Sequence, residues 1–194
     1  MNEPDDDLCD RCTESLPYTD NFGMQNGDYF DFCVSPLYYT GVVRRSVLNY
    51  KFRDASHYAD VYGILLAECI RECPKITYDI ITWVPLSKKR ERKRGYDQAM
   101  LLAEVMSVIL EDTVTKTLRK PREVQAQSEL GDRSERSVNI YGAYEAIDPE
   151  IVTGKRVLLV DDVITTGSTL DECAKILLAS GAVNVVCVTL ARAE

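Results

Sequence analysis

The chain has 194 residues, a formal net charge of −8 at pH 7 and 45% hydrophobic residues. This length suits one α/β domain with a full core and a small additional segment, and it excludes a two-domain enzyme of ordinary size. The negative charge excludes broad, charge-driven binding to nucleic acid, because neutralising phosphates requires a basic surface. No apolar run reaches membrane-spanning length and the first residues are acidic, so we expect a cytoplasmic protein without membrane insertion.

The N-terminal residues differ in pattern from the rest. Residues 1–34 carry Cys9-x-x-Cys12, a polar stretch and a lone Cys33, with weak hydrophobic periodicity. We therefore expect an N-terminal appendage at 1–34 and a main domain at 35–194. The remaining four of the seven cysteines fall in helix or strand patterns and are expected to be reduced core residues; they are Cys69, Cys73, Cys173 and Cys187.

From residue 36 onward the hydrophobic pattern predicts alternating strands and helices. Spacing near 3.6 residues predicts helices at 42–52, 58–73, 98–110 and 169–179. Short β-branched and apolar runs predict strands at 78–84, 155–160 and 183–190, with shorter ones near 36–41 and at 114–118. The final strand, helix and strand form a parallel crossover unit. The fold class is therefore α/β, with a central parallel sheet flanked by helices.

Two adjacent acids, Asp161 and Asp162, follow the strand predicted at 155–160. Ligands of a parallel sheet bind beyond the carboxyl ends of its strands, so this pair is expected at a ligand site. Neighbouring carboxylates repel each other and require a cation or several hydroxyl donors as compensation. A ribose with its 2′ and 3′ hydroxyls, together with Mg²⁺, supplies both.

A segment rich in hydroxyls connects the acids to the last helix; it consists of Thr165, Thr166, Gly167, Ser168 and Thr169. Its N–H groups and hydroxyls can surround a phosphate at the helix N-terminus, where the helix dipole adds attraction. Carboxylates followed by such a loop match a sugar with a 5′-phosphate, whereas a nucleotide P-loop requires a Gly-Lys-Ser/Thr sequence, which this chain lacks. A plain N-capped helix would leave the acids and most hydroxyls unexplained.

A basic segment, Lys88 to Arg94, follows the strand predicted at 78–84. A second anionic group of the ligand would need a positive site at another strand end, and Arg90 and Arg94 can clamp phosphate oxygens bidentately. A solvated charged surface is the alternative for such a run. Residues 119–140 are also polar and basic and lack a core pattern, so we expect a functional loop or lid there.

The sequence DDVITTGST at 161–169 resembles the signature of type I phosphoribosyltransferases, which bind phosphoribosyl pyrophosphate with Mg²⁺ and displace pyrophosphate at C1 of the ribose. The resemblance implies that Asp161 and Asp162 hold the ribose hydroxyls or the waters of the metal, and that residues 165–169 hold the 5′-phosphate. Some purine enzymes carry an acid at the position of Thr165, so a 6-oxopurine acceptor is disfavoured.

Combined motifs between Pro36 and Arg192 resemble the ComF family of competence-associated phosphoribosyltransferase-like proteins. They comprise LNYKFRD at 48–54, VP-x₄-R-x₃-RGYDQA at 84–99, Gln127-x-x-Leu130, Arg136-x-x-Asn139 and the 161–169 loop. In type I enzymes the loop after the corresponding strand binds pyrophosphate through backbone amides, which implies this role for Leu86, Ser87 and Lys88. The family's usual RGFNQ reads RGYDQ here, which places the charge of Asp97 near the expected anion site.

The ComF resemblance also implies a zinc ribbon, because family members often carry paired Cys-x-x-Cys hooks before the domain and tetrahedral Zn²⁺ needs four ligands. This chain offers Cys9, Cys12 and Cys33. Two alternatives remain: Asp31 or a residue of another chain completes a zinc site, or the cysteines are reduced without metal. The single histidine, His57, is expected at a helix start or on the surface.

The resemblance implies a protein that assists natural transformation by handling single-stranded DNA, with DNA-uptake proteins as partners. Three functions remain open: an active transferase, a salvage enzyme for a free nucleobase, and a non-catalytic module that senses phosphoribosyl pyrophosphate or a nucleoside 5′-monophosphate. In an active enzyme, Mg²⁺ and the basic loops would stabilise the departing pyrophosphate. Single-stranded DNA would require the stripe Lys88 to Arg94, extended by Arg119, Lys120 and Arg122.

Overall fold

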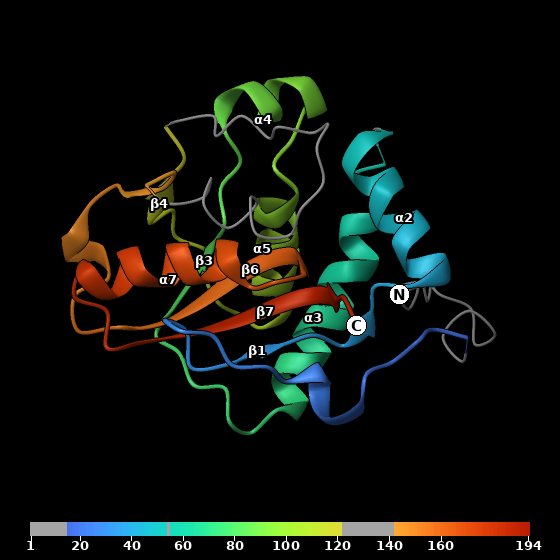
Figure 1. Cartoon of the computed structure of the whole chain (residues 1–194), viewed down its shortest axis with the longest axis horizontal. Helices are drawn as coiled ribbons and strands as arrows, with labels where there is room; N and C mark the ends of the chain where they lie inside the picture. The colour runs from blue at the N-terminus through green and yellow to red at the C-terminus, as the bar shows by residue number, and fades with distance from the viewer. Residues whose placement is uncertain (1–14, 54, 122–141) are drawn as a thin grey trace, which may run out of the picture.

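The computed structural model describes residues 15–53, 55–121 and 142–194. Its centre is a parallel sheet of five strands in the order β1-β7-β6-β3, with β2 also paired to β7 (Figure 1). The strands are β1 (Cys33–Val34), β2 (Leu37–Tyr38), β3 (Ile80–Trp83), β6 (Arg156–Ile164) and β7 (Asn184–Arg192). The expected α/β fold with a central parallel sheet is confirmed.

Helices cover both faces of this sheet. The helices are α2 (Gly41–Phe52), α3 (Tyr58–Glu72), α5 (Gln98–Ile109) and α7 (Ser168–Ala179), so the four predicted helices are confirmed. Leu158 and Val160 of β6 pack into one buried cluster with α2, α3 and α5, whereas Val157 and Leu159 pack into a second cluster with α7. A strand that is buried on both faces is a continuous apolar run, which explains the sequence VLLV. Figure 1 shows α7 on one side of the sheet and α3 and α5 on the other.

The basic segment forms a helix, α4 (Lys88–Arg94), to which the sequence analysis assigned no secondary structure. Ser87 begins the helix by accepting a hydrogen bond from the N–H of Arg90 at 3.4 Å. Gly95 ends it with a φ of 84°, in the left-handed region that glycine adopts without strain.

A small antiparallel ribbon pairs β4 (Leu118–Arg119) with β5 (Glu145–Ala146). The strand expected at 114–118 is therefore found only in part, as an isolated bridge from Val114 to Ile81 and the first residue of β4. The expected lid at 119–140 lies, from residue 122 on, outside the described residues. Two 3₁₀ helices, η1 (Asp20–Gly23) and η2 (Pro149–Ile151), complete the described elements.

The described part of the N-terminal segment packs on the main sheet. β1 pairs in parallel with β7, and the N–H of Asp31 donates to the carbonyl of Val185 at 2.9 Å. Phe30 is only 2% exposed and belongs to the cluster beneath α7. The expected domain boundary after residue 34 thus lies at the end of β1, a strand of the main sheet. The two-residue strand is too short to show a pattern of its own in the sequence.

Within the described ranges, no helix has both the length and the apolar character that crossing a bilayer requires. His57 is exposed at the start of α3, as expected. The four cysteines that were expected in the core are buried and unpaired by disulfides.

Gly63 permits the close packing of α3 on α5. A Cβ at this position would lie 2.4 Å from Val105 Cγ1 and 3.2 Å from the backbone nitrogen of Met106. Gly63→Ala should therefore lower the free energy of unfolding by about 1–3 kcal/mol, measured by urea denaturation. Helix propensity alone predicts the opposite, a gain of about 1 kcal/mol.

The double variant Gly63→Ala with Val105→Ala is the control for this packing prediction. It removes the methyl groups that the new Cβ would meet and should recover part of the stability lost through residue 63. A Gly63→Ala protein as stable as the wild type would contradict the close approach of the two helices.

Candidate functional site

β6 carries both carboxylates of the candidate site inside the strand. The sequence analysis ended this strand at Val160, but pairing with β7 continues to Ile164. Successive side chains of a strand point to opposite faces. Asp161 therefore lies on the face that packs against α7, and Asp162 on the face that packs against α2, α3 and α5. Each carboxylate has its own surroundings at the carboxyl edge of the sheet.

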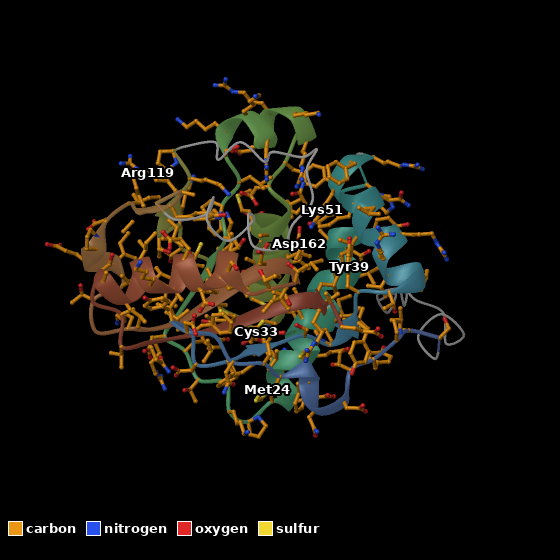
Figure 2. All side chains as sticks on the ribbon, in the orientation of Figure 1. Met24, Cys33, Tyr39, Lys51, Arg119 and Asp162 are labelled. Carbon is orange, nitrogen blue, oxygen red and sulfur yellow. The ribbon has the colours of Figure 1, made fainter. Side chains whose placement is uncertain are left out.

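Asp162 forms an ion pair with Lys51 of α2. Lys51 Nζ lies 2.7 Å from Asp162 Oδ1, and the two side chains are 20% and 11% exposed. Figure 2 shows Lys51 and Asp162 together at this edge. Burial lowers the pKa of Lys51, but the Asp162 carboxylate raises it, and the net shift is upward. Sequence reasoning missed this contact, although Lys51 stands within the LNYKFRD motif.

Asp161 lies near a different lysine. Burial, followed by the charge of Asp162, raises the pKa of Asp161 well above its usual range. Lys120 Nζ donates to the Tyr144 hydroxyl at 2.8 Å and lies 4.4 Å from the centre of its ring. Burial and the charge of Arg90 lower the pKa of Lys120, while Asp161 acts in the opposite direction. The structure thus gives each acid a cationic neighbour, Lys51 on one face and Lys120 on the other.

Residues 165–169 form the expected turn into α7. Together with Asp161, Val163, Ile164 and Leu170 they line a hollow. Gly167 has a φ of 81° and is the N-cap residue of α7. Because glycine has no side chain to cap the helix, the first N–H groups of α7 face the hollow without a side-chain acceptor from this position. The hydroxyls of Thr166 and Ser168 lie 2.9 Å apart beside them. This arrangement of N–H groups and hydroxyls fits a phosphate.

The N-terminal segment supports this turn. A Cβ at Gly167 would lie 3.7 Å from the ring of Phe30 and 3.8 Å from the side-chain nitrogen of Gln25, so both residues border the turn. The backbone N–H groups of Asp28 and Tyr29 donate to Asp171 Oδ1 at 2.8 and 2.9 Å, which joins the segment to the first turn of α7. Sequence reasoning gave no sign of these contacts.

The two arginines of α4 that were expected to clamp a phosphate, Arg90 and Arg94, lie in different surroundings. The Arg94 guanidinium is half-buried, donates to the side-chain oxygen of Gln98 and lies 4.8 Å from the centre of the Phe52 ring. Burial lowers the pKa of Arg94 and the charge of Asp162 acts in the opposite direction, so the guanidinium lies close enough to the carboxylate to interact with it. Arg90 is exposed. The two arginines expected to clamp one phosphate therefore differ in their surroundings.

Asp97 is a structural residue, not a negative charge that faces the anion site. It is 4% exposed and accepts hydrogen bonds from the N–H of Met100 at the start of α5 and from the N–H of Leu86 at 2.8 Å. Burial raises the pKa of Asp97, and these two N–H groups act in the opposite direction.

Two of the three residues expected to bind pyrophosphate, Leu86 and Ser87, already have hydrogen-bond partners within the protein. The N–H of Leu86 is already bound to Asp97, and Ser87 is 3% exposed and caps α4. Lys88 is exposed. The backbone-amide role expected for Leu86 stays a prediction, and it would require the N–H to leave the Asp97 carboxylate that accepts it here.

The structure describes only one of the three cysteines to which a zinc site was assigned, Cys33. Cys33 is fully buried in β1, where burial raises the pKa of its thiol to about 12. Cys9 and Cys12 lie outside the described residues. Among residues 15–53, 55–121 and 142–194, no group of three or more His, Cys, Asp or Glu is placed to hold a metal.

Comparison with known proteins agrees with this geometry. Residues 92–194 match the phosphoribosyl transferase domain. The chain is 28% identical over 205 residues to competence protein F of Haemophilus influenzae, covering 95% of this chain and 89% of that protein. It is 32% identical over 157 residues to DNA utilization protein YhgH of Salmonella typhi, covering 78% and 68%. The chain belongs to the ComF family of type I phosphoribosyltransferases.

Competence protein ComFC of Bacillus subtilis is a further ComF relative. It is 27% identical over 155 residues, which cover 79% of this chain and 61% of that protein. The family match includes α5 and the carboxylates of β6, but begins after Lys51. The fold and family expected from the sequence motifs are confirmed.

The raised pKa of Asp161, a partly buried acid of this ComF chain, leads to a prediction about stability. A carboxyl whose pKa is raised in the folded state stabilises the fold while it is protonated, and this contribution is lost as the pH rises through the folded-state pKa. Asp161→Asn removes that ionisation. The difference in unfolding free energy between Asp161→Asn and the wild type should be smallest below about pH 4, where the acid is protonated in both the folded and the unfolded protein. The difference should grow in favour of the variant toward neutral pH.

Urea denaturation of both proteins over this pH range measures the effect. Asp148→Asn, a change at an exposed acid before η2, is the matched control. A gain for Asp161→Asn that stays constant or shrinks as the pH rises would contradict the raised pKa.

Proposed function

We propose that this chain binds phosphoribosyl pyrophosphate, or a nucleoside 5′-monophosphate, with Mg²⁺ at the carboxyl edge of β6. The hollow at the start of α7 carries the proposal, because it combines Asp161, several hydroxyls and the N–H groups of a helix N-terminus. A 5′-phosphate bound by residues 165–169 would direct the ribose toward the acids at the end of β6. The match to the phosphoribosyl transferase domain supports the same ligand class.

The two acids fit Mg²⁺ by their chemistry, because this ion prefers carboxylate and water oxygens. When bound, Mg²⁺ would neutralise charge that develops on the pyrophosphate. The chain itself supplies positive charge around the acids from two helices, α2 and α4, and from the position after β4; these side chains are Lys51, Arg90, Arg94 and Lys120. Electrostatic stabilisation by these groups, without a protein nucleophile, would favour departure of pyrophosphate from C1.

The titration of phosphoribosyl pyrophosphate with Mg²⁺ by calorimetry tests this proposal. Asp161→Asn combined with Asp162→Asn should weaken binding by at least tenfold, about 1.4 kcal/mol. Asp60→Asn, at an exposed position of α3, should leave the affinity unchanged. Unchanged affinity in a folded double variant would refute the site.

Release of pyrophosphate separates the two enzymatic functions that the sequence left open from the sensing module. The protein is incubated with phosphoribosyl pyrophosphate, Mg²⁺ and each nucleobase of a panel. An active transferase or a salvage enzyme would release pyrophosphate when its acceptor is present. A sensing module would bind the ligand without release. The names of the relatives, which refer to competence and DNA utilization, favour a role of this chain in the use of incoming DNA, with DNA-uptake proteins as partners.

α4 supports a second candidate function, the binding of single-stranded DNA. The helix lies at the rim of the molecule (Figure 1) and exposes five basic side chains, Lys88, Lys89, Arg90, Arg92 and Lys93. In a chain with a net charge of −8, such a local surface is where phosphates of a strand would bind. Because Arg94 of the same helix faces the carboxylates, DNA and phosphoribosyl pyrophosphate should compete.

Replacing Lys88, Lys89, Arg92 and Lys93 by Gln should lower the affinity for a labelled oligonucleotide and reduce its dependence on salt, measured by fluorescence anisotropy. Arg44→Gln with Arg45→Gln, two exposed basic positions on α2, is the control and should have a smaller effect. Binding that ignores salt, or that persists under saturating phosphoribosyl pyrophosphate and Mg²⁺, would place the DNA site elsewhere.

A further inference from the structure

Lys51 is bound to Asp162, one of the two acids to which the proposed function assigns the ribose or a metal ion. Its ammonium lies 2.7 Å from one carboxylate oxygen, in a pair whose side chains are 20% and 11% exposed. A lysine ammonium is positively charged at neutral pH. A partly buried pair of this kind is screened by salt much less than a surface pair. The acid is therefore already compensated in the ligand-free protein.

The backbone beside Lys51 is held in place by two tyrosines. Tyr50 is fully buried, and its hydroxyl donates to the carbonyl of Gln98 at 2.9 Å. The hydroxyl of Tyr96 donates in turn to the carbonyl of Tyr50. These bonds join the last turn of α2 to the start of α5. The position of Lys51 is thus set by the fold, while its four-carbon side chain can still turn toward another anion.

We propose that Lys51 is an internal counter-cation of the carboxylate pair that competes with divalent metal at Asp162 and is drawn away by the phosphates of the ligand. A unit positive charge at hydrogen-bond distance from the same oxygen opposes the approach of a divalent ion. An anionic ligand gives the ammonium a second partner and so removes this opposition. The inference rests on the proposed function only for the identity of that ligand; the competition itself involves the metal and the protein alone.

Binding of Mn²⁺ to the full chain without ligand, followed by electron paramagnetic resonance, tests the competition. Lys51→Met should bind Mn²⁺ about tenfold more tightly than the wild type, or more, because the competing charge is gone. Lys51→Arg, which keeps the charge, should stay close to the wild type. Lys155→Met, at an exposed lysine just before the amino end of β6, is the matched control and should change nothing. Equal Mn²⁺ affinity of Lys51→Met and the wild type would overturn the proposal.

A second measurement uses the wild-type chain in case Lys51→Met does not fold. The ¹⁵N resonance of the Lys51 ammonium, assigned by its loss in Lys51→Arg, should shift when phosphoribosyl pyrophosphate is added with Mg²⁺. With Mg²⁺ alone, at concentrations too low to fill the ligand-free site, the resonance should stay in place, and at saturating Mg²⁺ it should shift; a resonance that does not move when Mg²⁺ saturates the site would overturn the proposal. If Lys51→Met gains Mn²⁺ affinity but phosphoribosyl pyrophosphate does not bind, the proposed function fails and the competition stands.

Discussion

One strand, β6, has to form the centre of the hydrophobic core and also carry both carboxylates of the site. Its apolar half is buried on both faces, and the same pleat continues through Asp161 and Asp162. Alternation therefore sends the two acids to opposite faces, although the charge of Lys51 acts on both. Lys51 compensates one acid, and Lys120 lies near the other. Helix α2 and the end of β4 thus place these two lysines near the acids of β6.

The elements around the two acids are joined to one another. Tyr50 and Tyr96 tie the end of α2 to the segment between α4 and α5, and Arg94 packs over Phe52 of α2. Asp97 then ties the start of α5 to the chain that leaves β3. These contacts connect α2, α4 and α5 around the two carboxylates. The basic helix α4 and the candidate site at Asp161 and Asp162 therefore belong to one region.

Burial of Asp161 illustrates a conflict between stability and binding. A carboxyl with a raised pKa destabilises the folded protein as it ionises, yet its charge is what a ribose or a metal would bind. The phosphate turn is supported differently, by packing: Phe30 and Gln25 border Gly167, and Asp171 binds the backbone before Phe30. The N-terminal segment, expected as an appendage, is thus part of the support of the site.

The sequence by itself determined the parallel α/β fold, the four helices α2, α3, α5 and α7, the turn at 165–169 and the family, because these depend on residues that are contiguous in the chain. Local periodicity and a glycine among hydroxyls are sufficient signals for them. Only the tertiary structure decided that Cys33 lies in the core, that Asp97 binds Leu86 and that Lys51 meets Asp162. These contacts join residues from separate elements, and they follow from strand order, strand length and the direction of each side chain on the pleat. Hydrophobic spacing along a single segment carries no information about such pairings.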